Sequence, residues 1–243
     1  MRVTRLYLET RLSEGIDLDL ELEQSHYLGN VLRMAEGASL QVFNAECGEY
    51  RATISALKKS KASIVIEQKI ADYTAPPLKI HLILGISRGD RMDYAIQKSV
   101  ELGVGSITPM YSEFGEVRFK QADRLQRKLQ HWQRIAISAA EQCGRLDVPK
   151  IGEPKEFGHC LNRDADENTV LFEPDANESL QDIAINASVT VVVGPEGGFS
   201  TTELDAARQS TNCHLVKLGP RVLRTETAPV VALSVIQQLY GDF

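Results

Sequence analysis

The sequence lacks any run of about 18 apolar residues, the length at which a transmembrane helix would be indicated. Near its start it also lacks a positively charged segment followed by an apolar stretch, the pattern of a secretory signal. With 43% hydrophobic and 25% charged residues, the composition is that of an ordinary globular protein. We therefore expect a cytoplasmic protein that does not associate with membranes.

Cysteine is scarce, with four residues in a chain of 243. Cys47, Cys143, Cys160 and Cys213 form no C-x-x-C pair, so neither a zinc cage nor a disulfide framework is indicated. The histidines are isolated from one another, and His159 directly precedes Cys160 instead of standing at a metal-ligand spacing. The sequence thus predicts no metal site and fits a reducing compartment.

An excess of positive charge is missing as well, since the net charge is −6. Binding to nucleic acid depends on neutralising phosphates, so this balance argues mildly against a general nucleic-acid binder. Between residues 118 and 150, however, basic residues outnumber acidic ones. This stretch, which holds Arg118 and Arg145, is either a solvated helix face or a strip that contacts phosphate.

The chain divides into two regions at the Ala75-Pro76-Pro77 segment, because neither proline can donate a sheet hydrogen bond. Residues 1–72 combine a helical stretch at 25–34 with short alternating strands on either side of a turn at 46–49, a pattern typical of a small β-barrel. Residues 76–243 alternate strands with helices, which predicts an α/β domain with a parallel sheet covered on both faces. The expected strands span 78–86, 107–110, 169–172, 189–193 and 214–218, and the expected helices span 92–100, 125–139, 179–185, 201–208 and 228–239.

A glycine-rich loop, Gly194-Pro195-Glu196-Gly197-Gly198-Phe199-Ser200, follows the apolar strand 189–193. Ser200 stands three residues before Glu203, which is the signature of a capping box at a helix start. Open α/β sheets bind ligands at the carboxyl ends of their strands, where glycines allow the backbone to approach closely. The loop has neither the lysine of a P-loop nor the spacing of a dinucleotide fingerprint, so it is a cofactor loop of another kind or serves packing alone.

A second polar loop, from Leu218 to Pro229, lies between the strand 214–218 and the last helix. It places Arg221, Arg224 and Glu226 just before a helix start. One interpretation is surface charge together with a glutamate favoured by the helix dipole. We favour the other, in which this loop and the glycine-rich loop follow successive strands of one sheet and lie side by side in a single site.

A third segment, Glu141-Gln142-Cys143-Gly144-Arg145, ends the long helix. Glu141 and Arg145 are neighbours at i and i+4, which by itself indicates a helix-stabilising pair followed by a cap. Trp132 lies on the apolar stripe of the same helix and is expected in the core rather than as a platform for a base.

Together these segments resemble the ribosomal RNA small subunit methyltransferase E family, SPOUT enzymes that form 3-methyluridine in 16S ribosomal RNA. The resemblance rests on residues 194–200, 218–229, 141–145 and Lys98–Gly103. His26 to Arg33 is similar to the PUA-like RNA-binding domain of that family. The resemblance covers essentially the whole chain.

The resemblance implies a SPOUT fold, with a parallel sheet and a C-terminal trefoil knot in 76–243 and a PUA-like β-barrel in 1–72. It also implies a homodimer that uses S-adenosyl-L-methionine to methylate 16S ribosomal RNA, with the small ribosomal subunit as the expected context. The implied cofactor contacts, mostly through backbone, are Leu171, Gly194, Pro195, Glu196, Gly197, Gly198, Leu218, Gly219, Arg221, Leu223 and Ala228.

Methyl transfer from a sulfonium to N3 of uracil needs neither a metal nor a covalent intermediate, so positioning supplies much of the acceleration. Loss of the N3 proton pushes negative charge onto the flanking carbonyl oxygens, where an arginine would stabilise it. Arg221 and Arg224 are candidates for this role or for holding phosphate, and Glu226 and Glu141 are alternative proton acceptors. The candidate RNA contacts are Arg2, Arg5, Arg33, Arg118 and Arg145.

Three other functions fit parts of the pattern. A SPOUT ribose 2′-O-methyltransferase would also need an arginine, and a non-catalytic RNA-binding assembly factor could use the same surfaces. A nucleotide hydrolase is disfavoured, because the glycine-rich loop lacks a lysine.

Overall fold

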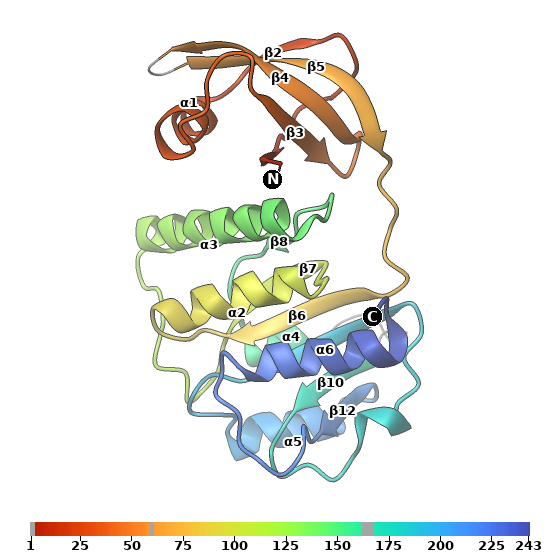
Figure 1. Ribbon diagram of the computed structural model, residues 1–243. Helices are drawn as coiled ribbons and strands as arrows, with labels where there is room; N and C mark the ends of the chain where they lie inside the picture. Colours follow the sequence, from red (N-terminus) through yellow and green to blue (C-terminus); the bar gives the residue numbers. More distant parts are fainter. Residues whose placement is uncertain (1–2, 59–60, 162–167) are drawn as a thin grey trace. The chain divides into compact units, whose positions relative to one another are not determined.

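The computed structural model describes residues 3–58, 61–161 and 168–243 and divides the chain into two compact units (Figure 1). The first unit extends to Ala75 and includes the later segment Ala140–Val148. The second unit contains Pro76–Ala139 and Pro149–Phe243. The sequence patterns did not indicate that residues 140–148 belong with the N-terminal unit.

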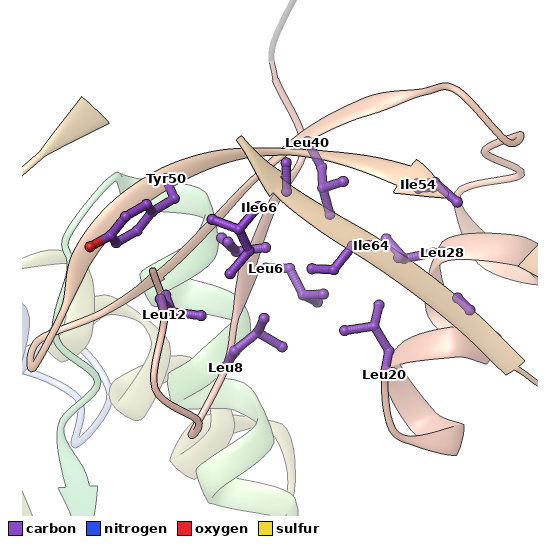
Figure 2. Packing of buried hydrophobic residues seen from close by; sticks show 13 residues of the cluster. Leu6, Leu8, Leu12, Leu20, Leu28, Leu40, Tyr50, Ile54, Ile64 and Ile66 are labelled. Carbon is purple, nitrogen blue, oxygen red and sulfur yellow. The ribbon is translucent and has the colours of Figure 1, made fainter. Parts of the chain in front are cut away.

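The first unit is built on a five-stranded sheet with the order β1-β3-β4-β5-β2. The predicted alternation is confirmed, because Leu40 and Val42 on one strand and Ile64 and Ile66 on another are fully buried. Figure 2 shows Leu40, Ile64 and Ile66 packed with Leu28 of the helical segment in one apolar core, to which Val42 also belongs. The strands are β1 (Arg5–Tyr7), β2 (Asp17–Asp19), β3 (Ser39–Asn44), β4 (Gly48–Lys58) and β5 (Lys61–Ala71).

The helical segment of this unit differs from the prediction. The helix α1 (Leu22–His26) begins earlier than expected and continues as one turn of π-helix, η1 (Tyr27–Val31). It ends before the predicted residue 34, and Arg33 then adopts a φ of 52°. Leu28 is the buried anchor of this segment, whereas Val31, Leu32 and Arg33 are exposed.

The second unit has a parallel sheet with the order β12-β10-β11-β6-β7-β8, and β9 pairs with β7. The predicted α/β class is therefore confirmed. Helices pack in pairs, α2 with α6 and α4 with α5 (Figure 1). The strands are β6 (Lys79–Gly85), β7 (Ser106–Tyr111), β8 (Lys150–Ile151), β9 (Lys155–Glu156), β10 (Asn168–Phe172), β11 (Ser188–Val193) and β12 (Cys213–Val216). The helices are α2 (Asp90–Glu101), α3 (Ala122–Cys143), α4 (Phe157–Leu161), α5 (Thr201–Gln209) and α6 (Ala228–Tyr240).

Most of the long elements agree with the sequence patterns, and the differences have local causes. The helix expected at 179–185 is only the short 3₁₀ turn Leu180–Asp182, whose carbonyl at Leu180 accepts a hydrogen bond from the Tyr240 hydroxyl. Two-residue strands such as β8 and β9 carry no periodic signal in the sequence. Within the described residues, no helix is both long enough and apolar enough to cross a membrane.

Candidate functional site

A cavity of about 460 Å³ lies at the carboxyl ends of three strands of the second unit. It is lined by residues 172–174 at the end of β10, by the glycine-rich loop after β11, and by the loop after β12 as far as Ala228. Parallel sheets bind ligands at this edge, and the volume lies within the range of small-molecule sites. The two polar loops that the sequence placed side by side thus line one cavity.

The expected adjacency of the two strands is wrong. Strand β10 lies between β11 and β12, because it pairs with both of them in register. The loops after β11 and β12 therefore flank the end of β10. For this reason Phe172, Glu173 and Pro174 also line the cavity, and nothing in the sequence had pointed to them, since strand order is not encoded in periodicity.

The glycine-rich loop is fixed at both of its ends. At the C-terminal end of the loop, the Ser200 hydroxyl accepts a hydrogen bond from the backbone N–H of Glu203 (3.2 Å), and the N–H of Ser200 donates to the Glu203 carboxylate (2.9 Å). This is the predicted capping box. At its start, Gly85 of β6 packs directly on the backbone of Gly194 and Pro195, where a side chain on residue 85 would clash.

Thr225 joins the two loops. Its buried hydroxyl donates to the carbonyl of Gly194 (3.0 Å) and lies 3.3 Å from the Ser87 hydroxyl, which follows β6. The loop before α6 is thus held against the glycine-rich loop. Thr225 therefore positions the two loops through its hydroxyl, a role that the sequence patterns did not indicate.

Arg221, Arg224 and Glu226 all line the cavity, as the sequence predicted for one site. The carboxylate oxygen Oε2 of Glu226 is buried and has no hydrogen-bond partner in the part of the chain that the structure describes. Arg91, another lining residue that the sequence analysis missed, forms an ion pair with Glu196 (3.1 Å). The cavity lining thus combines a carboxylate that has one buried, unpaired oxygen with two exposed arginines, an arrangement suited to moving a proton from a bound acid.

Two family models match this chain. An RNA methyltransferase domain matches residues 74–237, and an RNA methyltransferase PUA domain matches residues 20–67. Ribosomal RNA small subunit methyltransferase E of Buchnera aphidicola (subspecies Schizaphis graminum) is 35% identical over 244 residues, which cover 99% of this chain and 98% of the relative. The chain belongs to the ribosomal RNA small subunit methyltransferase E family. The resemblance inferred from the sequence motifs is thereby confirmed.

Solved structures agree with membership in the methyltransferase E family. The family member from Neisseria gonorrhoeae, described as bound to S-adenosyl methionine, is 36% identical with a TM-score of 0.91, and the match covers 100% of both chains. A methyltransferase from Legionella pneumophila, described as a complex with bound cofactor SAM, is 35% identical with a TM-score of 0.95 over 100% of both chains. The fold class therefore includes an N-terminal PUA-like domain in addition to the α/β domain.

The cavity contains most of the cofactor contacts that the methyltransferase E resemblance implied. Two implied contacts do not line it. Leu171 is fully buried in the core beside Val192, and Gly197 packs against the backbone of Phe114. The implied contacts that line the cavity are Gly194, Pro195, Glu196, Gly198, Leu218, Gly219, Arg221, Leu223 and Ala228.

Glu141, the other candidate proton acceptor, is not among the residues that line the cavity. It belongs to the first unit, where its carboxylate accepts a hydrogen bond from the N–H of Tyr7 (3.1 Å). Arg5 holds the same segment, because its guanidinium pairs with Glu49 (2.6 Å) and donates to the carbonyls of Ala140 and Arg145. These contacts explain why residues 140–148 belong to the first unit.

The predicted RNA contacts differ in how far their charges are already engaged. Arg33 is exposed. Arg145 pairs with Asp147 (2.7 Å), and Arg118 forms two hydrogen bonds with the Glu156 carboxylate (2.6 and 3.1 Å). Arg2 lies outside the described residues. A role of these arginines in RNA binding stays a prediction.

We expect Glu141→Gln to flatten part of the pH dependence of stability. Burial raises the pKa of the Glu141 carboxyl above its ordinary value of 4.5, against smaller opposing effects from the Tyr7 N–H and Arg5. The folded state then binds the proton more tightly than the unfolded state, so stability falls as pH rises from about 4.5 through the raised pKa. Glutamine stays neutral and can still accept from Tyr7, so the variant should gain stability relative to the wild type as pH rises.

Urea unfolding of both proteins between pH 4.5 and 8 measures this difference. Glu46→Gln, an exposed change at the turn between β3 and β4, serves as the control and should follow the wild type. Parallel curves for wild type and Glu141→Gln would contradict the expectation.

Proposed function

We propose that this protein transfers the methyl group of S-adenosyl-L-methionine to N3 of a uridine in 16S ribosomal RNA of the small ribosomal subunit. The observation that carries the proposal is the cavity in which the glycine-rich loop and the loop holding Arg221, Arg224 and Glu226 meet. Relatives in the same family, matched over their whole length, are described with the same methyl donor bound.

The cavity fits this cofactor. Gly198 and Gly219 have φ values of 69° and 96°, and no atom lies within 4 Å of where a side chain would begin at either residue. Glycine at these positions leaves open space beside exposed backbone groups. Leu218 and Leu223 add apolar lining. The residues that would hold the cofactor are Gly194, Pro195, Glu196, Gly198, Leu218, Gly219, Leu223 and Ala228.

The bound cofactor supplies an electrophilic methyl group on a sulfonium, and the chain supplies positioning and proton handling. Glu226 accepts the N3 proton, because its carboxylate faces the cavity and one oxygen is buried without a partner among the described residues. Arg221 and Arg224 stabilise the negative charge that spreads onto the uracil carbonyl oxygens. Glu226 is preferred over Glu141 for the proton, since only Glu226 lines the cavity.

Glu226→Gln is expected to lower kcat by about 100- to 10,000-fold, because the amide cannot accept the proton at neutral pH. The affinity for S-adenosyl-L-methionine should change little, since the two side chains have the same shape. Rates of methyl incorporation into 16S ribosomal RNA and calorimetric titration with the cofactor separate the two effects. Glu153→Gln, at an exposed position, is the matched control, and a wild-type rate for Glu226→Gln would exclude Glu226 as the proton acceptor.

The finer features of the family also belong to this proposal: the SPOUT class with its C-terminal trefoil knot, a homodimer, and a location in the cytoplasm. After β12 the chain passes Gly194, to which Thr225 donates a hydrogen bond, before it enters α6. Val235, Leu239 and Phe243, exposed apolar residues in and after α6, support a second copy as partner.

The deciding experiment incubates the protein with methyl-labelled cofactor and unmodified 16S ribosomal RNA or small subunits, followed by mass mapping of the nucleosides. We expect 3-methyluridine at one position. A 2′-O-methylated nucleoside would favour the ribose methyltransferase instead. RNA binding without methylation would indicate a non-catalytic assembly factor.

A further inference from the structure

A second cavity, of about 400 Å³, also lies in the α/β unit. It shares no lining residue with the first cavity, between the glycine-rich loop and the loop 218–228, which we call the methyl-donor cavity. It is lined by Ser87–Gly89 after β6, by Glu116–Phe119 after β7, and by Arg124, Lys128 and Trp132 of α3. The two cavities are neighbours, because the hydroxyl of Ser87 in the second lies 3.3 Å from the hydroxyl of Thr225 in the first. A ligand group held in the second cavity would therefore lie close to the methyl-donor cavity.

Four basic side chains line the second cavity, and two of them, Arg124 and Lys128, are not engaged in an ion pair with a described residue. Arg88 is paired with Glu116 (3.0 Å), and Arg118 is paired with Glu156 (2.6 Å). Together with Trp132, Arg124 and Lys128 are spaced by four along α3, so all three lie on one face of the helix.

One further hydrogen-bond donor at this cavity is unpaired. Trp132 is almost completely buried, and its indole N–H has no hydrogen-bond partner within residues 3–58, 61–161 and 168–243. An indole N–H can only donate, so the group that satisfies it must be an acceptor.

We propose that this second cavity binds a phosphodiester group of the RNA substrate. Arg124 and Lys128 supply the charge, and the unpaired indole N–H of Trp132 in the wall of the cavity is a donor that an anionic oxygen would satisfy. The phosphate contact then anchors the RNA strand beside the methyl-donor cavity. The inference rests on the proposed function, because it assigns a subsite for the substrate of that reaction.

Steady-state methylation tests this subsite with the double variant Arg124→Ala/Lys128→Ala. We expect the KM for unmodified 16S ribosomal RNA to rise about 10-fold, with kcat and the Kd for S-adenosyl-L-methionine within about two-fold of wild type. The slope of log KM against log salt should fall by about 1 to 2, reflecting the lost phosphate contact. Arg127→Ala is the matched control, because Arg127 lies on the same helix and donates to the carbonyl of Asp123 on that helix.

Trp132 is the only tryptophan in the chain, so its fluorescence reports directly on the cavity. Titration with a short RNA of the target sequence should change this fluorescence at micromolar concentration in the wild type and in Arg127→Ala. The double variant should require about 10-fold more RNA. Inorganic phosphate alone should act only at millimolar concentration, and an equal response to phosphate and RNA would overturn the assignment to the RNA backbone.

A third variant addresses the indole N–H itself. Trp132→Phe keeps an aromatic ring against Phe119 but removes the donor, and its KM for RNA should rise about two- to five-fold. Circular dichroism melting checks that each variant is folded. Normal methylation with equal KM values for the double variant and Arg127→Ala would overturn the phosphate site alone, whereas a wild-type protein that methylates no RNA would overturn the proposed function.

Discussion

Arg224→Ala is expected to lower kcat for methylation by about 100- to 1,000-fold, the usual cost of removing a donor that stabilises developing negative charge. Arg224 lines the methyl-donor cavity and is exposed, so no packing within the unit depends on it. The free energy of unfolding should therefore change by no more than about 0.5 kcal/mol. The loss arises in the reaction and not in the fold.

Single-turnover methylation of 16S ribosomal RNA measures this effect, and urea unfolding checks stability. Arg208→Ala removes an equally exposed arginine that pairs with Asp205 on α5, and it should behave as wild type. Arg224→Lys retains the charge but not the planar fork, so it should recover only part of the rate. Full activity of Arg224→Ala would remove this residue from the site and leave Arg221 as the candidate.

Gly198→Val is expected to weaken binding of S-adenosyl-L-methionine by about 100-fold or more, for two reasons. Gly198 has a φ of 69°, a conformation that costs a residue with a side chain about 1 to 2 kcal/mol and a β-branched residue more. The valine side chain would also extend into the open space beside the loop. The loop must then either change its backbone or fill part of the cavity.

Calorimetric titration with the cofactor measures the affinity of this variant. Gly198→Ala still places a side chain at the positive φ, but with less backbone strain than valine and less bulk, so an intermediate affinity is expected. Gly158→Ala is the control, because its added methyl group meets open space without a positive φ. Unchanged affinity in Gly198→Val would place the cofactor away from this loop.

The local elements of the α/β unit could be predicted because their signals are contained in short stretches. The buried strand Ser188–Val193 contains four valines within six residues, and the capping box of Ser200 and Glu203 needs only four positions. The order of strands could not be predicted in the same way. It depends on which parallel strands pair across long connections, and that is how β10 came to lie between β11 and β12.

Side-chain partners were the second limit of the sequence analysis. Arg5 was predicted as an RNA contact because of its charge, yet its side chain is largely buried and pairs with Glu49 in the first unit. Glu141 and Arg145 suit a mutual helix pair, yet each has other partners. A charged residue is recognisable from sequence, but the fold decides which of several opposite charges it meets.

The path of the α/β sheet has a consequence for how the protein acquires its activity. Strand β6 pairs with β11, so Lys79 meets Ser188 across more than a hundred intervening residues. Such distant pairings close late and slow the folding of a chain. The methyl-donor cavity needs the ends of β10, β11 and β12 together with Thr225, so no partly folded intermediate would contain it. During refolding, recovery of cofactor binding should therefore coincide with the last kinetic phase, which makes the ligand a reporter of complete maturation.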